Sequence, residues 1–311
     1  GNLGSLAALN RELLGPGGHG LLGLKGFLLG GLSGNVVLFG FFLFQLVFMD
    51  AAATIPTGSM AERLKFSAFV VMSLWVSMVI YPLYGNWVWG GGWLANLGHT
   101  LGFGHGVVDF AGSGVVHMAG GMLALAGAIV LGPRIGKFNR DGSANQIPGH
   151  NLPMAVVGTM VLFFGWFGFN AGSTLNGNDT RIAVIAANTL LAGAAGGLAA
   201  MCYMWRFGPT QKPDTANSLN GVLAGLVAVT ASCAFIPSWA AVAIGLVAGV
   251  LVCRAASFFE QRGVDDPVGA VAVHGIGGLW GVLALGIFAD GSYGAGWNGV
   301  GTQEYLGVAG R

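Results

Sequence analysis

Charged side chains are scarce in this chain, which has 311 residues and only 8% Asp, Glu, Lys and Arg. A soluble domain usually contains about 25% charged residues. Hydrophobic residues make up 54% of the sequence and the mean hydropathy is +0.71, so polar side chains are too few to cover a soluble protein of this size. The net charge of +1 argues against nucleic acid as a partner. The composition indicates an integral membrane protein.

Cysteine is also scarce, with Cys202, Cys233 and Cys253 scattered on apolar segments. Three separated cysteines are more typical of small buried side chains than of a disulfide or a metal site. Glycine, in contrast, is abundant at 57 residues. Small residues let membrane helices approach one another closely.

Apolar runs of about 20 residues, the length that crosses a bilayer, occur eight times. They lie near residues 35–58, 66–84, 110–132, 152–172, 182–205, 217–235, 239–256 and 267–289. Only a short segment around Pro237 separates the sixth from the seventh. We therefore expect an all-α polytopic membrane protein that forms a single transmembrane domain over residues 1–311.

Lysine and arginine residues alternate between loops, which predicts the orientation. The loops after the first, third, fifth and seventh spans hold Arg63, Lys65, Arg134, Lys137, Arg140, Arg206, Lys212, Arg254 and Arg262. The other loops hold Arg11, Lys25, Arg181 and Arg311. The positive-inside rule places the first set in the cytoplasm. We expect a protein of the plasma or inner membrane, with the N-terminus of this chain outside.

Two distant segments are copies of one pattern. They read DFAGSGVVHMAGG from residue 109 and DPVGAVAVHGIGG from residue 266. Each histidine follows its aspartate by eight residues, about 12 Å along a helix, and half of a hydrocarbon core is about 15 Å. Since the two copies enter from opposite faces, both imidazoles should reach the midplane.

Such an inverted repeat places a transport site on the axis between the halves, which we expect at approximately residues 1–145 and 146–311. The second half has five expected spans and the first has three. The repeat thus predicts two further spans upstream.

Histidine in an apolar helix needs a hydrogen-bonding partner. A single one is most often a packing residue, but two at symmetric depths favour a paired site in which neutral imidazoles share a proton. A metal would need three or four ligands, and no cysteine or carboxylate falls at the same depth. We therefore expect neither a metal nor a cofactor.

Four other side chains can be interpreted from their positions in the sequence. Asp109 and Asp266 are placed to cap helices, and Asp109 could also add a negative field to the outer vestibule. Asp50, near Pro56, suggests a broken helix with polar partners and a structural role. Trp89, in a glycine-rich loop, is either an interfacial anchor or a cation-binding ring above a pore.

These segments resemble the Amt/Mep/Rh ammonium transporter family. The similar stretches are residues 44–45, 61–63, 89–92, 109–117, 150–154, 165–173 and 264–275. They cover nearly the whole chain, from the family's third span to its tenth. The resemblance implies an eleven-helix fold of two inverted five-helix halves and a final helix, assembled as a homotrimer with one pore in each subunit.

The resemblance also implies roles on the outer side of the pore. Trp89, Phe44 and Ser173 would bind the cation, and Asp109 would support its recruitment. Phe44 together with Phe169 would form an aromatic gate beneath that site.

Deeper in the pore, the resemblance implies that His117 and His274 line the path of ammonia after ammonium has lost a proton. Potassium has no proton to lose and would be excluded. Two alternatives remain: an ammonium sensor within a signal transducer, and a Rh-like channel for neutral ammonia. Implied partners are ammonium or ammonia, lipid, and a PII-type regulator or a fused cytoplasmic signalling module.

Overall fold

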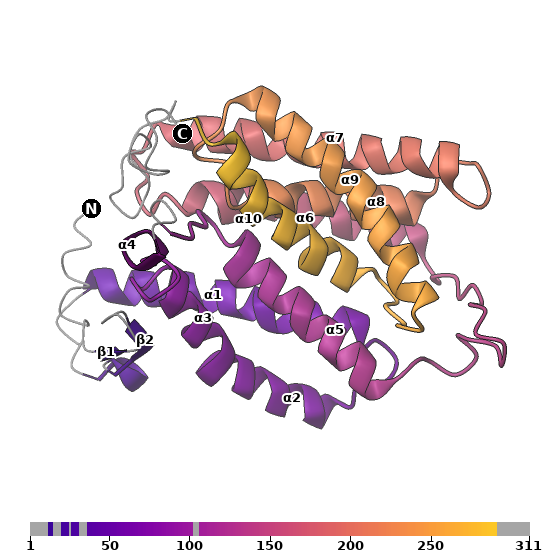
Figure 1. Ribbon diagram of the computed structural model, residues 1–311, viewed down its shortest axis with the longest axis horizontal. Helices are drawn as coiled ribbons and strands as arrows, with labels where there is room; N and C mark the ends of the chain where they lie inside the picture. Colours follow the sequence, from indigo (N-terminus) through magenta and orange to yellow (C-terminus); the bar gives the residue numbers. More distant parts are fainter. Residues whose placement is uncertain (1–11, 15–19, 25, 31–35, 102–105, 291–311) are drawn as a thin grey trace.

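Helices that run along one common direction dominate the computed structural model (Figure 1), which describes residues 12–14, 20–24, 26–30, 36–101 and 106–290. They are α1 (Val36–Ser59), α2 (Phe66–Trp75), α3 (Tyr81–Val88), α4 (Leu97–Leu101), α5 (Ala119–Leu131), α6 (Leu152–Gly172), α7 (Arg181–Phe207), α8 (Thr215–Val229), α9 (Ser238–Gln261) and α10 (Gly277–Phe288). The shorter elements are β1 (Glu12–Leu14), β2 (Gly20–Gly23) and η3 (Phe27–Leu29), and the π-helical segments η4 (Val76–Ile80), η5 (Ser113–Met118) and η6 (Val271–Ile276).

Seven helical segments of the described chain are long and apolar enough to cross a membrane. They are Val36–Ser59, Phe66–Val88, Ser113–Leu131, Leu152–Gly172, Arg181–Phe207, Ser238–Gln261 and Val271–Phe288. The second joins α2, η4 and α3, and the third and seventh join a π-helical segment to the α-helix that follows it. This confirms the predicted all-α polytopic membrane protein.

The sixth predicted span, residues 217–235, is longer than the helix found there, because α8 has 15 residues and ends at Val229. The residues that follow are buried in turns, where their backbone finds other partners. The amide of Asn188 donates to the carbonyls of Cys233 and Ile236 at 2.9 and 3.0 Å. Non-helical backbone is tolerated at membrane depth where it is buried in protein.

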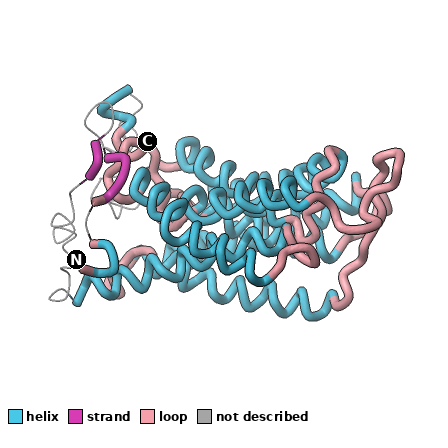
Figure 2. Tube along the Cα trace, turned by 90° about the horizontal axis from the view of Figure 1, so that it is seen from below, coloured by secondary structure: helices cyan, strands magenta, loops and turns pink. Residues whose placement is uncertain are grey.

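Polar residues fix several helix starts. The Asn151 side chain accepts from the backbone nitrogen of Met154 at the start of α6, and Asp214 accepts from Asn217 at the start of α8. The helices then pack side by side, with α7 against both α8 and α9. Figure 2 shows the resulting bundle from a second direction, with loops at its ends and the small sheet β1–β2 at one of them.

The two copies of the histidine pattern meet inside this bundle. The segment η5–α5 lies beside η6–α10, with α10 against η5 and α5 against η6. The two run in opposite directions, as the magenta α5 and the yellow α10 show in Figure 1. The bundle thus brings residues 157 positions apart into one site.

An ionic cluster joins the two copies at the end of the bundle where α1, α5 and α9 terminate. Asp265 accepts from the backbone and Nε of Arg134 at 2.8 and 2.9 Å, and the Arg63 guanidinium donates to the carbonyls of Ser59 and Gly132. Burial acts to raise the pKa of Asp265, but the hydrogen bonds and charges of the two arginines hold it below its usual value.

Candidate functional site

Each histidine segment begins at an aspartate that caps it. The Asp109 carboxylate accepts from the backbone nitrogens of Gly112, Gly114 and Val115 at 2.8–2.9 Å. A left-handed glycine stands three residues after the aspartate in both copies, with φ of 114° at Gly112 and 77° at Gly269. A side chain would strain the backbone there, which accounts for glycine at this offset of the repeat.

Asp266 makes the equivalent cap in the second copy. Its carboxylate accepts from the backbone nitrogens of Ala270 and Val271 at 2.9 and 2.8 Å. Asp109 is only 1% exposed, and its carboxylate faces its own helix. The structure therefore supports the capping interpretation of both aspartates, and any effect of Asp109 on a cation would act through space.

The two repeat histidines touch. Their Nδ1 atoms are 3.2 Å apart and their ring centroids are 5.2 Å apart. One Nδ1 must carry a proton and the other must accept it, so at least one ring in the pair has an unprotonated Nδ1. Close helix packing permits this contact, because a Cβ at Gly121 would overlap the backbone of Gly275.

Aromatic rings from α6 enclose His117. Trp166 stacks on its imidazole with centroids 5.1 Å apart and planes 18° apart, and the Phe169 ring lies 5.4 Å away. The Trp166 indole is held by a 2.9 Å hydrogen bond to the hydroxyl of Thr230. The Nε2 atom of His117 is buried without a hydrogen-bonding partner in the described part of the chain. It is therefore an unpaired polar atom among aromatic side chains in the described part of the chain.

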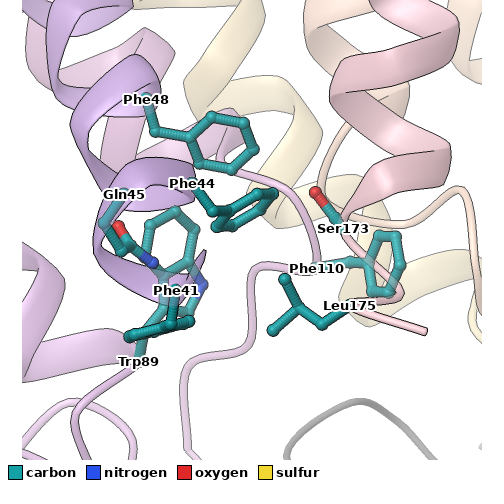
Figure 3. Close-up of a pocket in the computed structure, with 8 residues that line it drawn as sticks. All are labelled: Phe41, Phe44, Gln45, Phe48, Trp89, Phe110, Ser173 and Leu175. Atoms are coloured by element: carbon teal, nitrogen blue, oxygen red, sulfur yellow. The ribbon is translucent and has the colours of Figure 1, made fainter. Parts of the chain in front are cut away.

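A small hollow lies beside Phe48 (Figure 3), whose ring stacks on Phe169. Its lining residues are Phe41, Phe44, Gln45, Phe48, Trp89, Phe110, Ser173 and Leu175. The Trp89 indole donates to the Asp109 carbonyl at 2.6 Å, and the Ser173 hydroxyl donates to the Phe169 carbonyl at 2.7 Å. Three side chains predicted for the outer site, Trp89, Phe44 and Ser173, therefore line one hollow, whereas the Asp109 side chain is turned away from it.

The ring contacts of Phe169 differ from those expected for the predicted gate of Phe44 and Phe169. The ring that stacks on Phe169 belongs to Phe48, with centroids 4.1 Å apart and planes 23° apart. Phe44, one helical turn before Phe48, packs on the Phe48 ring with centroids 4.3 Å apart. Both phenylalanines share a face of α1, so the spacing of four residues was the signal that could have included Phe48. Trp166 was missed too, although it lies within the quoted motif of residues 165–173.

Asp50 does not lie in a broken helix. The helix α1 continues from Val36 to Ser59 with Pro56 inside it. Ser59 donates to the Pro56 carbonyl and Thr57 to the Thr54 carbonyl, so hydroxyl groups supplement the backbone bonds near the proline. Asp50 itself is exposed on the surface of α1. The prediction of a helix break was wrong, since α1 continues through Pro56 as one helix.

Metal-ligating side chains do not gather in groups of three or more His, Cys, Asp or Glu within the described ranges. The paired histidines therefore meet each other and Trp166, with no carboxylate or thiolate beside them to complete a coordination shell.

Comparison with known proteins agrees with this architecture. A model of the Ammonium Transporter Family matches residues 13–310. The chain belongs to the ammonium transporter family. It is 52% identical over 297 residues to the ammonium transporter Amt2 of Archaeoglobus fulgidus, which covers 94% of this chain and 63% of that protein. A putative ammonium transporter of Synechocystis is 42% identical over 253 residues, covering 79% of this chain and 55% of that protein.

Solved structures of the family share the fold. A protein described as a sensor Amt protein superimposes with a TM-score of 0.81 at 41% identity, covering 94% of this chain and 72% of that one. Saccharomyces cerevisiae Mep2 gives a TM-score of 0.69 at 32% identity, covering 79% of this chain and 52% of that one. The chain thus spans between about half and two thirds of the curated relatives described above. It is a multi-pass membrane protein of a transporter family.

Proposed function

We propose that this protein conducts ammonium across the membrane by passing neutral ammonia along the paired histidines. The observation that carries the proposal is the contact between His117 and His274, with Trp166 and Phe169 packed against the His117 ring. Imidazoles at this depth are tolerated only when neutral and hydrogen-bonded, and two in contact give a proton-sharing chain in an otherwise apolar passage.

The physical problem is to separate ammonium from potassium, which has a similar size and the same charge. Taking either ion into a low-dielectric passage costs several kcal/mol even after relaxation. Ammonia avoids most of that cost because it is neutral, whereas potassium cannot lose its charge. Stripping the proton at the entrance therefore selects ammonium, and the histidines or water return the proton on the other side.

The hollow beside Trp89 is the proposed entrance. Phe44, Phe48 and Trp89 present ring faces that attract a small cation, and the Ser173 hydroxyl offers a lone pair. Phe48 and Phe169 close the passage beneath it, so that an entering molecule must displace their stack. The Asp109 carboxylate, behind the Trp89 contact, adds a negative field that favours a cation in the hollow.

Current recording on the full-length protein in vesicles tests this proposal. Ammonium and methylammonium should be carried and potassium should not. A current with ammonium supports transport of net charge, whereas ammonium-dependent alkalinisation without current supports the Rh-like alternative. A potassium current of similar size would refute the mechanism.

The sensor alternative also has a specific observation in its favour. The solved structure described as a sensor Amt protein superimposes over 94% of this chain. A sensor would use the same hollow and histidine pair to register ammonium. It would show ammonium-dependent change in the full-length protein, measured as a shift in tryptophan fluorescence, with no ammonium flux.

The surroundings of the pore complete the proposal. We propose a homotrimer with one pore per subunit, two inverted halves near residues 1–145 and 146–311, and the N-terminus of the chain outside. The nine basic residues, which lie in alternate loops or in the last turns of the helices before them, support this orientation. Native mass spectrometry tests the trimer, and labelling of cysteines introduced at Gly91 and Arg140 from either side of sealed vesicles tests the orientation.

A further inference from the structure

A buried hydroxyl group from η5 lies at the end of the helix α8. The Ser113 side chain donates to the carbonyl of Val227 and accepts from the backbone nitrogen of Ala231, both at 2.6 Å. A continuing α-helix would join that nitrogen directly to that carbonyl, four residues earlier. A side chain inserted into this ladder of hydrogen bonds kinks or interrupts a helix. The insertion accounts for the end of α8 at Val229.

The turn that follows α8, residues 230–235, is bonded to the first copy of the repeat. The carbonyl of Thr230 accepts from the backbone nitrogen of Ala111 at 3.2 Å, and that of Ala231 accepts from Phe110 at 3.0 Å. With the two bonds of Ser113, four hydrogen bonds therefore join η5 and the residues before it to the end of α8 and this turn. Ser113, Thr230 and Ala231 are fully buried, so bulk water does not reach them.

The same turn holds the indole that covers His117. Thr230 Oγ1 donates to the Leu226 carbonyl at 2.7 Å and accepts from Trp166 Nε1 at 2.9 Å. The Trp166 ring stacks on the His117 imidazole with centroids 5.1 Å apart, and His117 follows Ser113 by four residues on η5. The contacts therefore form a closed ring, which leaves η5 at Ser113 and returns to it at His117 through the indole.

The second copy of the repeat lacks both parts of this arrangement. Ala270 stands at the offset from the capping aspartate that Ser113 has in the first copy, and its methyl group has no hydrogen-bonding atom. In the part of the chain that the structure describes, His274 meets no aromatic ring besides that of His117. The bridging hydroxyl and the stacked indole thus occur together in one copy and are missing together from the other.

We propose that Ser113 is a positioning residue, which places His117 against Trp166 by fixing η5 to the turn after α8. Thr230 attaches the indole to that turn, and Ser113 attaches the histidine segment to it, so the two rings meet in a fixed arrangement. The inference rests on the proposed function in one respect, since it explains how His117 is placed in the proposed passage.

Loss of the hydroxyl should let α8 continue. In Ser113→Ala, the hydroxyl no longer separates the backbone nitrogen of Ala231 from the carbonyl of Val227, and a buried donor needs a partner. A bond between them extends α8 and moves the carbonyls of the turn away from the residues before η5. The segment η5 then shifts relative to the turn, and His117 moves from beneath the indole.

Fluorine NMR of the full-length protein labelled with 5-fluorotryptophan tests this placement without a transport measurement. Trp166→Phe identifies the resonance of Trp166, and His117→Ala gives its position without the stacked imidazole. Ser113→Ala should shift the Trp166 resonance toward its position in His117→Ala. The matched control is Ser232→Ala, which removes another fully buried hydroxyl of the turn, one that donates only locally to the Val229 carbonyl at 3.4 Å. It should leave the Trp166 resonance at the wild-type position.

A rescue variant separates positioning from a general loss of stability. Ser113→Ala/Ala231→Pro removes the hydroxyl together with the N–H group that donates to it. Because proline has no N–H to bond the Val227 carbonyl, α8 must still end. The double variant should return the Trp166 resonance to the wild-type position, also where Ser113→Ala alone does not fold. An unchanged Trp166 resonance in folded Ser113→Ala, or a double variant no better folded or placed than the single one, would overturn the inference.

Ammonium flux into vesicles distinguishes this inference from the proposed function. Ser113→Ala should reduce the flux about tenfold or more, because a misplacement of about 1 Å can cost about a hundredfold in rate, and the double variant should restore most of it. A displaced Trp166 resonance with wild-type flux would support the positioning role of Ser113 and contradict the proposed passage beside His117.

Discussion

The two copies of the histidine pattern reach the same contact in different surroundings. His117 is 3% exposed and is stacked against Trp166 and near Phe169, whereas His274 is only partly buried. Both copies have the capping aspartate, the left-handed glycine and the histidine at the same offsets. The aromatic rings of α6 pack only against the histidine of the first copy. The two imidazoles thus occupy equivalent positions in the repeat but differ in exposure. This difference fits the proposed pore, in which the His117 side is closed and the His274 side is more open.

The largest expected effect comes from separating the two copies. Gly121→Ala places a methyl group on the backbone of Gly275, so the helices must move apart and the Nδ1 contact must lengthen. A misplacement of about 1 Å in a functional pair can cost about a hundredfold in rate, and we expect a loss of that order in ammonium flux into vesicles. The control is Gly286→Ala in α10, where a Cβ meets no atom within 4 Å. Equal flux in the two variants would show that the close helix contact is dispensable.

A smaller effect should distinguish the roles of the two phenylalanines of α1, Phe48 and Phe44. Phe48 is 2% exposed and stacks on Phe169, whereas Phe44 is partly buried and lies one turn away. Phe48→Leu should raise the leak of potassium or protons, because the stack that closes the passage is lost, while Phe44→Leu should mainly weaken ammonium binding. The leak is measured as the ratio of ammonium to potassium current in each variant, and binding as the ammonium concentration that gives half of the maximal current. The assignment of Phe48 to the gate fails if Phe44→Leu raises the leak more than Phe48→Leu does.

The two caps should differ in stability. Asp109 accepts from three backbone nitrogens and is almost fully buried, whereas Asp266 accepts from two. Replacing a cap by alanine costs about 0.5–2 kcal/mol, and leaving buried donors without a partner adds to it. We expect a lower thermal midpoint in detergent for Asp109→Ala than for Asp266→Ala. A lower thermal midpoint for Asp266→Ala than for Asp109→Ala would show that the number of capping hydrogen bonds does not determine the stability of each copy.

The smallest effect concerns the ionic cluster that ties the copies together. The pKa of Asp265 is held below its usual value by Arg134 and Arg63 despite burial, so its contribution to stability is present above its unfolded pKa, about 3.9. That contribution is lost as the pH falls through the lower, folded pKa. The thermal midpoint of wild type should therefore drop more between pH 6 and pH 3 than that of Asp265→Asn. An identical drop would exclude Asp265 as a source of the pH dependence.

Much of the fold follows from the sequence because membrane spans need a length and a composition that sequence shows directly. The duplicated offsets also predicted that His117 and His274 approach one another, since equal depths from opposite faces leave few other arrangements. The end of α8 could not be predicted, because the buried turn after Val229 depends on the Asn188 amide from a different helix.

The site was predicted less completely than the fold. Whether Phe44 or Phe48 meets Phe169 depends on how far α1 slides along α6, and both rings share one helix face. The direction of the Asp109 carboxylate depends on the left-handed turn at Gly112. The position of one helix along its neighbour depends on how their side chains pack. The residue spacing within each helix does not determine it, so a shift of one turn could not be predicted.

The central claim is that the touching imidazoles pass ammonia and exclude potassium, and the double variant His117→Ala/His274→Ala tests it most directly. The measurement is the current carried by ammonium and by potassium through the full-length protein in vesicles, normalised to the amount of folded protein. The account predicts that the ammonium current is lost or that potassium is carried as well. Ammonium current at the wild-type level with potassium still excluded would contradict it.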